Sequence, residues 1–171
     1  AEEESFLDEL GLYIIKGACK DAQKLQKEGT PLSISVNISP KQLESAVFVR
    51  EVRRILQEVD LHDIQLILEV TERSLLSTSG RILERIRELK QLGIQMSMDD
   101  FGMGHSSMMY LQENAFDEVK LDGSLVRQIL ENERSRDIVR GITRLAASMQ
   151  FHVVAEFVET REQMELLKAL H

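Results

Sequence analysis

The fold is decided by a stretch in the middle of the chain, Ile94-Gln95-Met96-Ser97-Met98-Asp99-Asp100, in which an apolar run ends in two carboxylates. An apolar run that ends in a carboxylate, an amide or an ammonium recurs at four other places. These are Ser33-Ile34-Ser35-Val36-Asn37, Leu66-Ile67-Leu68-Glu69, Phe116-Asp117-Glu118-Val119-Lys120 and Phe151-His152-Val153-Val154-Ala155-Glu156. A helix-like stretch follows most of them, so the rhythm predicts parallel strands joined by helices. In such folds, ligands bind at the carboxyl ends of the strands.

The expected strands alternate with amphipathic segments. The strands are predicted at about 33–38, 64–70, 94–99, 116–121 and 151–156, and the helices at about 4–28, 40–59, 82–92, 107–112, 125–149 with a break near Asn132, and after Thr160. Ser39 with Gln42, and Thr160 with Gln163, have the spacing of capping boxes. Gly93 is placed to end a helix in a left-handed conformation.

The bulk composition limits the class of protein. The 171 residues are 43% hydrophobic and include 29 acidic against 21 basic side chains, which suits one domain. The net charge of −8 argues against a nucleic-acid polymer as partner, although a metal would still allow a small anionic ligand. The single cysteine, Cys19, lies in a helical apolar pattern, and its side chain is expected to be buried. One cysteine forms no disulfide within the chain, which fits a protein of a reducing compartment. No apolar run approaches the roughly 20 residues of a membrane span. We expect a cytoplasmic domain, whether or not a longer parent is tethered to a membrane.

The number of expected strands leaves two architectures open. Five parallel strands do not close a (β/α)8 barrel, which needs eight strands and about 250 residues. The residues alone therefore allow either an open doubly wound sheet or a barrel with part missing.

Oxygen donors end most of the expected strands, namely Asn37, Glu69, Asp99, Asp100 and Glu156. Mg²⁺ and Mn²⁺ prefer such ligands. Adjacent carboxylates are hard to keep ionised without a cation, and at a strand–loop junction Asp99 and Asp100 could serve two metals about 3.5–4 Å apart. Lys120 at the same edge could hold a phosphate oxygen or orient an attacking water.

Each of these residues also has an ordinary structural explanation. Asn37 suits a turn, a lone glutamate suits an ion pair, the aspartate pair suits a cap, and Lys120 suits a solvated surface. Their shared position at one end of successive strands favours a site. Glu72 has two interpretations as well, an acceptor for backbone amides of a neighbouring loop or an acid at a helix N-terminus.

Five motifs together resemble, in this order, those of the bacterial EAL-domain cyclic di-GMP phosphodiesterases, over nearly the whole chain. They are Val36-Asn37-Ile38-Ser39, Glu69-Val70-Thr71-Glu72, Asp99-Asp100-Phe101-Gly102-Met103-Gly104-His105-Ser106-Ser107, Lys120-Leu121-Asp122 and Val154-Ala155-Glu156-Phe157-Val158-Glu159-Thr160. The resemblance implies an α/β, TIM-like (β/α)8 barrel, of which about five strand–helix units are present. It implies hydrolysis of cyclic di-GMP to linear pGpG with two Mg²⁺ or Mn²⁺ ions.

The resemblance also implies a role for each matching residue. Asn37, Glu69 and Asp99 resemble ligands of one metal. Asp100 resembles a ligand that is shared with, or belongs to, the second metal, and Glu156 resembles an acid that helps bind or activate the water. Lys120 resembles the lysine that contacts this water, and Glu72 the glutamate that braces the loop from Phe101 to Ser107. The loop and substrate-side candidates are Phe101, Gly102, Gly104, Ser107 and Glu159. A homodimer and flanking sensory or GGDEF-type domains are the implied partners.

Several departures from the family pattern qualify these expectations. The Glu-Ala-Leu segment, with its metal-ligand glutamate, and the last strand are absent. We therefore expect residues 1–171 to be a single EAL-type domain, incomplete at both ends and inactive in isolation. Met103 stands for a threonine, His105 for an aromatic residue and Phe157 for a glycine. The bulky Phe157 beside Glu156 motivates the alternative of a non-catalytic cyclic di-GMP receptor or scaffold.

Overall fold

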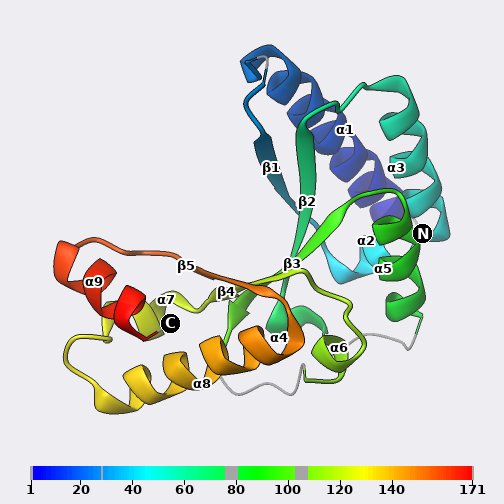
Figure 1. Ribbon diagram of the computed structural model, residues 1–171. Coiled ribbons are helices and arrows are strands. Elements are labelled where there is room, and N and C mark those ends of the chain that lie inside the picture. Colours follow the sequence, from blue (N-terminus) through cyan, green and yellow to red (C-terminus); the bar gives the residue numbers. More distant parts are fainter. Residues whose placement is uncertain (1, 28, 76–80, 103–107, 171) are drawn as a thin grey trace. The chain divides into compact units, whose positions relative to one another are not determined.

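The computed structural model describes residues 2–27, 29–75, 81–102 and 108–170. Figure 1 shows these residues as alternating helices and strands. The strands are β1 (Leu32–Asn37), β2 (Ile64–Thr71), β3 (Gln95–Phe101), β4 (Glu118–Leu121) and β5 (His152–Ala155). The helices are α1 (Glu2–Leu25), α2 (Pro40–Glu44), α3 (Ala46–Glu58), α4 (Glu72–Leu75), α5 (Ile82–Gln91), α6 (Met108–Gln112), α7 (Gly123–Arg127), α8 (Glu133–Met149) and α9 (Arg161–Ala169).

The strand order is β1-β2-β3-β4-β5, so spatial order follows chain order. A doubly wound sheet needs a reversal of strand order, whereas a barrel is built by adding each strand beside its predecessor. The order therefore decides between the two architectures that the residues left open, in favour of a partial barrel. Among the described helices, none combines the length and the apolar character that crossing a bilayer requires.

The chain folds into two compact units. The first comprises Ala1–Val70 and Ser77–Met96, and the second comprises Thr71–Leu76 and Ser97–His171.

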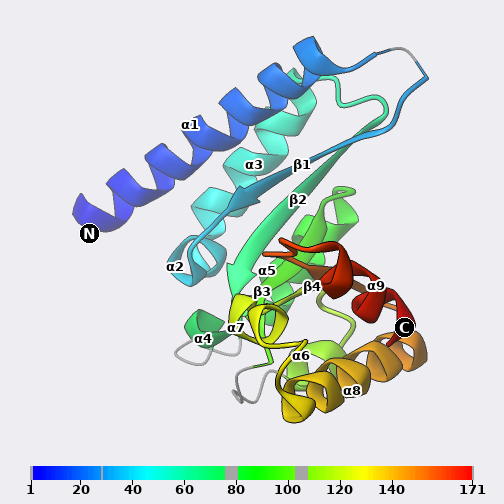
Figure 2. The same ribbon diagram turned by 90° about the vertical axis from the view of Figure 1, so that its left-hand side faces the viewer.

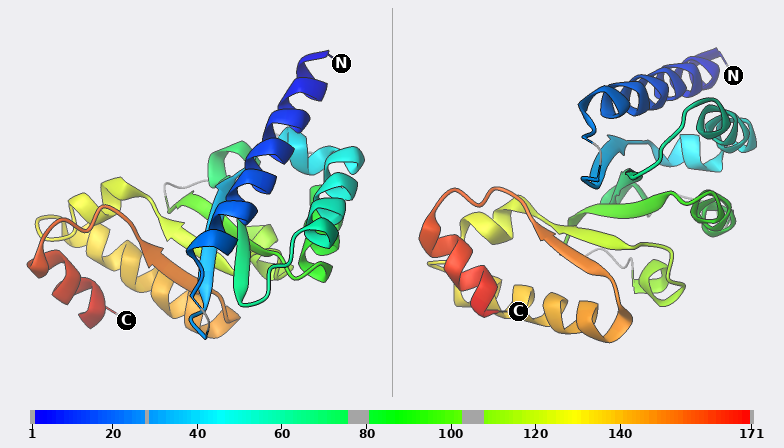
Figure 3. Two further views of the ribbon diagram at one scale, coloured as in Figure 1. Left: turned by 90° about the horizontal axis from the view of Figure 1, so that it is seen from above. Right: turned by 45° about the horizontal axis from the view of Figure 1, so that its top comes forward.

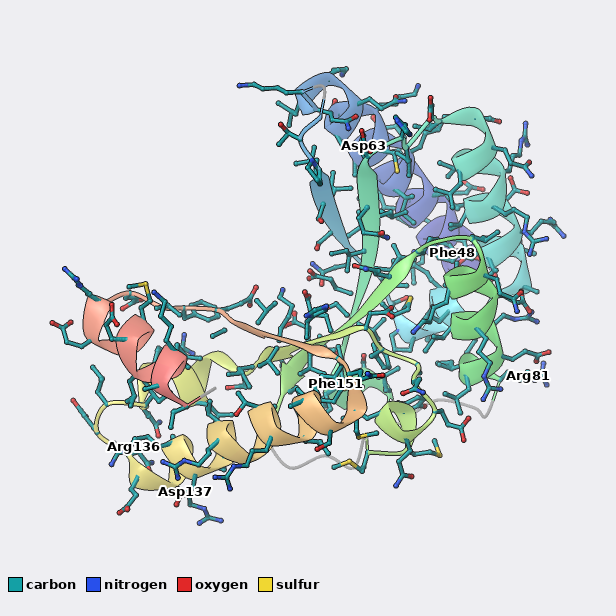
Figure 4. All side chains as sticks on the ribbon, viewed as in Figure 1. Phe48, Asp63, Arg81, Arg136, Asp137 and Phe151 are labelled. Atoms are coloured by element: carbon teal, nitrogen blue, oxygen red, sulfur yellow. The ribbon has the colours of Figure 1, made fainter. Side chains whose placement is uncertain are left out.

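In the first unit, β1 and β2 pair in parallel, with Asn37 opposite Glu69 at their carboxyl ends. Helix α1 packs on β1 and α3, and α5 packs on α2 and α3 (Figure 2). Phe48, labelled in Figure 4, and Leu43 are fully buried in this core.

The helix predicted from Pro40 to about Val59 is broken at Ser45. Ser45 has an extended backbone, and its hydroxyl accepts a hydrogen bond from Phe48 N and so caps α3. The same hydroxyl donates to Asp8 Oδ2 at 2.7 Å, which ties the break to α1. A serine that satisfies the amides of a second helix start offers the backbone an alternative to a continuous helix.

The capping box predicted at Ser39 and Gln42 is present. Gln42 does more than cap, because its Nε2 also donates to Leu7 O of α1 at 2.8 Å. This contact depends on Gly11, where an added Cβ would overlap with Gln42 Nε2. The buried amide therefore joins α2 to α1 through a gap that only a glycine leaves open.

In the second unit, β3 pairs with β4 and β4 with β5, all in parallel. Helix α8 packs on β5 and α7, and it lies beside β5 in both views of Figure 3. Asn132 caps α8 through its Oδ1, which explains the predicted break in the helical pattern. The second predicted capping box, Thr160 with Gln163, opens α9.

We predict opposite effects for two alanine substitutions in α1. Gly17→Ala should raise the free energy of unfolding by up to about 1 kcal/mol, because glycine is a poor helix former and an added Cβ at Gly17 meets nothing within 4 Å. Gly11→Ala should lower it, because the methyl group displaces Gln42 from Leu7 O. Chemical denaturation measures both. Equal stabilisation by the two variants would contradict the Gly11–Gln42 packing.

Cys19 should be chemically inert in the folded protein. Its side chain is fully buried, and burial raises the pKa of the thiol, so little of the nucleophilic thiolate forms at neutral pH. A disulfide-exchange reagent such as dithionitrobenzoate should react only after denaturation. A Cys19→Ala/Lys20→Cys variant, with its thiol at the neighbouring exposed position, is the matched control. Native Cys19 reacting as fast as this control would overturn the prediction.

Candidate functional site

Lys120 lies between two carboxylates at the carboxyl end of the second unit's strands. Its Nζ is 2.7 Å from Glu156 Oε1 and 3.8 Å from Asp99 Oδ1. The three residues come from β4, from the residue after β5 and from β3. The Lys120 side chain is only 11% exposed, so this charge is held inside the unit rather than solvated.

Strand register places these side chains on one face. Ser97 pairs with Glu118, and Ser97 Oγ donates to Glu118 Oε1 at 2.8 Å. Asp99 and Lys120 follow these two residues by two positions, so both point to the same face. Val119 and Leu121, which alternate with them, are buried on the other face.

The adjacent aspartates sit on a bulge rather than after the strand end. The predicted strand stopped near Asp99, whereas β3 continues to Phe101 with a register shift between Met98 and Phe101. Asp100 has a φ of +56°, and its N–H donates to Asp99 Oδ1 at 2.9 Å. A bulge interrupts the strict alternation of side chains. Phe101, expected in the following loop, is instead a buried end residue of β3.

Burial raises the pKa of Asp99 above its ordinary value. The Asp100 N–H and the Lys120 ammonium act in the opposite direction, and the carboxylates of Asp100 and Glu156 add to the rise. Burial disfavours the ionised carboxylate, and a nearby cation relieves that cost. Here the Lys120 ammonium is that cation, and the carboxylate oxygens of Asp99 and Glu156 are also the kind of ligand that Mg²⁺ and Mn²⁺ prefer.

Glu72 lies at a helix N-terminus and also accepts a backbone hydrogen bond, so it fits both interpretations drawn from the sequence. It is the first residue of α4, and its carboxylate accepts a hydrogen bond from Gly102 N at 3.2 Å. Glu72 is buried, with 1% of the residue exposed. Gly102 has a φ of +110°, and an added Cβ there would lie 2.9 Å from Leu125 Cδ1. Glu72 thus holds the end of β3 immediately after the aspartate pair.

Asn37 and Glu69 belong to the first unit. They are register partners at the carboxyl ends of β1 and β2, and Ile38 N donates to Glu69 O at 2.9 Å. Glu69 is buried and Asn37 exposed. Within each unit, the described residues gather no group of three His, Cys, Asp or Glu side chains that could hold an ion. The assignment of Asn37, Glu69, Asp99, Asp100 and Glu156 to metals stays a prediction.

The residues after Glu156 turn toward α7. Phe157 packs its ring against Gly123 and lies 4.6 Å from the Arg127 guanidinium carbon. With this bulky residue next to it, the Glu156 carboxylate still lies 2.7 Å from Lys120 Nζ. Glu159 is exposed, and its N–H donates to Gln163 Oε1 at 2.8 Å.

Two site candidates, Gly104 and Ser107, lie outside the described residues. The sequence reasoning missed Arg127, for which no local signal exists. It also gave no role to Asp122, which caps α7 by accepting from Ser124 N. The aspartate before Gly123-Ser124 is an N-cap signal that could have revealed this role.

Comparisons with known proteins place this geometry in a family. The model of the family described as "EAL domain" matches residues 1–171. A Caulobacter vibrioides signalling protein is 40% identical over 98% of this chain and 20% of its own length. The cyclic di-GMP phosphodiesterase NbdA of Pseudomonas aeruginosa is 34% identical over 100% of this chain and 22% of its own.

Solved structures agree with the sequence relatives. The phosphodiesterase PaMucR in complex with c-di-GMP has a TM-score of 0.84 at 30% identity, over 99% of this chain and 74% of that chain. A manganese and cy-diGMP complex of Klebsiella pneumoniae BlrP1 has a TM-score of 0.83 at 27% identity, over 95% of this chain and 41% of that one. The chain spans about a fifth of the length of the curated relatives above. The family model matches all 171 residues, and the five ordered motifs and the strand order agree with that match. This chain therefore belongs to the EAL domain family.

Proposed function

We propose that this chain is part of a metal-dependent phosphodiesterase that hydrolyses cyclic di-GMP to linear pGpG. The observation that carries the proposal is the Lys120 ammonium, held largely out of solvent between Asp99 and Glu156 at the strand ends. Relatives named as cyclic di-GMP phosphodiesterases support the choice of substrate. Cyclic di-GMP carries two negatively charged phosphodiesters, so divalent cations held by these carboxylates would be needed to attract it despite the net charge of −8.

The residues that would hold the metal are the oxygen donors at the strand ends. In the second unit these donors are Asp99, Asp100 and Glu156. For Asn37 and Glu69, which belong to the first unit, the ligand role rests on the sequence motifs alone. The proposal is two Mg²⁺ or Mn²⁺ ions, and the manganese complex of a structural relative supports this class of metal. When bound, such ions polarise phosphoryl oxygens and lower the pKa of a water.

The chain's own groups would handle the proton and the charge. Glu156 is oriented by its contact with Lys120, which leaves its second oxygen available to accept a proton from the attacking water. As the water oxygen bonds to phosphorus, one ester P–O bond breaks, and the leaving oxygen takes up a proton from solvent while Glu156 returns its own proton to solvent. Lys120 offsets the negative charge that builds up on the phosphoryl oxygens.

The partners of the whole protein are proposals on the same basis. The relatives extend well beyond the matched region, and one is named as both a diguanylate cyclase and a phosphodiesterase. We propose a homodimer in which flanking sensory or GGDEF-type domains control this site. Cyclic di-GMP is the small-molecule partner.

The test is turnover by the full-length protein. With Mn²⁺ and cyclic di-GMP, chromatography should show pGpG formation, and chelation with EDTA should abolish it reversibly. Tight binding of cyclic di-GMP without any pGpG at any metal concentration would replace the enzyme with the receptor that Phe157 motivates. If the protein neither binds nor hydrolyses cyclic di-GMP, both the enzyme and the receptor proposals are rejected.

Lys120→Ala should lower kcat by about 100- to 10,000-fold, the range for a positioned acid–base or charge-stabilising group. The lysine's removal also leaves Asp99 and Glu156 facing each other without a cation. Lys168→Ala in α9, where the lysine is exposed, is the matched control and should retain full activity. Equal kcat values for the two variants would remove Lys120 from the mechanism.

Glu72→Ala should lower kcat at least about tenfold, because it leaves the amide of Gly102 without its acceptor, at a cost of about 1–3 kcal/mol. Glu72→Gln keeps an acceptor oxygen and should lose less. Glu131→Ala, at an exposed position, controls for loss of a carboxylate. If the alanine and glutamine variants at Glu72 lose the same activity, the charge of Glu72 matters and its bond to Gly102 does not.

A further inference from the structure

We propose that Phe157 is a positioning residue, whose ring, seated on Gly123 beneath Arg127, holds Glu156 against Lys120. The inference rests on the proposed function for its kinetic consequence. Its structural basis is independent, because Phe157, Gly123, Arg127, Glu156 and Lys120 all belong to the second unit.

The first observation is backbone strain at Phe157. Its φ of +56° lies in the left-handed region, where a bulky residue is rare. Such strain costs of the order of 1–3 kcal/mol and persists only where surrounding contacts impose it. A residue held in this way next to Glu156 fixes the direction in which the chain leaves β5.

The second observation is the fit of the Phe157 ring. An added Cβ on Gly123 would lie 2.5 Å from Phe157 Cδ2 and 2.8 Å from Cε2, so the ring lies directly on the glycine backbone. Arg127, one turn along α7, places its guanidinium carbon 4.6 Å from the ring centroid. A cation over an aromatic face is attracted by the ring quadrupole. Phe157 as a whole is 53% exposed, so these contacts fix its ring rather than burial in the core.

A second attachment joins the same loop to α7. The buried Gln163 side chain accepts hydrogen bonds from Glu159 N and Thr160 N at 2.8 and 3.0 Å. Its Nε2 donates to Val126 O of α7 at 3.4 Å. Both ends of the segment between β5 and α9 are therefore anchored to one short helix.

Helix α7 in turn is fixed to the strand that carries Lys120. Asp122, two residues after Lys120, caps α7 and donates its N–H to Phe101 O of β3 at 3.0 Å. The segment held on α7 begins at Glu156, and α7 itself follows closely after Lys120 in the chain. Lys120 Nζ and Glu156 Oε1 lie 2.7 Å apart, so α7 links the two residues of this ion pair.

The experiment uses the full-length protein and compares Phe157→Ala, Phe157→Tyr and Gly123→Ala with the wild type. It also compares the double variant Gly123→Ala/Phe157→Gly with Phe157→Gly alone. Phe157→Ala should lower kcat about 10- to 100-fold, the scale of a small misplacement of a catalytic group, with an unchanged KM for cyclic di-GMP. Phe157→Tyr should retain activity. Gly123→Ala alone should lower kcat, because its methyl group meets the Phe157 ring. In the Phe157→Gly background, which lacks the ring, Gly123→Ala should cause no further loss of kcat. Gly141→Ala, where an added Cβ meets nothing within 4 Å, and Leu130→Ala, an exposed apolar truncation, are the controls.

A second measurement does not depend on turnover. Mass spectrometry of brief lysine acetylation reports how accessible and how strongly paired Lys120 is. Labelling of Lys120 should rise several-fold in Phe157→Ala and stay at the wild-type rate in Phe157→Tyr and Leu130→Ala.

The outcomes separate the two proposals. A wild-type protein without turnover rejects the proposed function, and the Lys120 labelling then decides the role of Phe157 alone. A rise in KM with constant kcat would make Phe157 a ligand contact and overturn positioning. Unchanged labelling in Phe157→Ala, or additive effects of Gly123→Ala and Phe157→Gly, would also overturn it.

Discussion

The structure of the second unit depends on one electrostatic constraint, a largely buried ammonium that is shared by carboxylates from neighbouring strands. Lys120 is mostly removed from solvent, and a buried charge is tolerated only when it is paired. Its partners Asp99 and Glu156 are far apart in sequence, so the pairing fixes how β3, β4 and the end of β5 are aligned. The bulge at Asp100, the cap at Asp122 and the turn at Phe157 are local solutions that let the backbone meet this demand.

The same constraint explains why polar residues occupy one face of these strands. Ser97 and Glu118 hydrogen-bond to each other one step below Asp99 and Lys120. A polar face is costly in a sheet unless its groups pair with one another or with a ligand. The opposite face, with Met98, Val119 and Leu121, supplies the hydrophobic burial. Stability and the candidate chemistry are thus separated onto two faces by the two-residue period of a strand.

Much of the secondary structure was predictable from local chemistry. The capping boxes at Ser39 and Thr160, the cap at Asn132 and the left-handed Gly93 were all foreseeable because they depend on residues within one helical turn. The break at Ser45 was not predicted, because the apolar spacing of the helix continues across it. The extension of β3 to Phe101 was missed because a bulge conceals the strand's continuation from a pattern of alternation.

The sequence by itself determined the alternation of strand and helix, the family, and the residue types that gather at the strand ends, because periodicity and ordered motifs are written along the chain. Only the tertiary structure decided the unreversed strand order, the placement of Lys120 between Asp99 and Glu156, and the use of Glu72 as an acceptor for Gly102. It also decided that the ring of Phe157 rests on Gly123. These contacts join residues more than a dozen positions apart. Their geometry follows from register and packing, which no local pattern encodes.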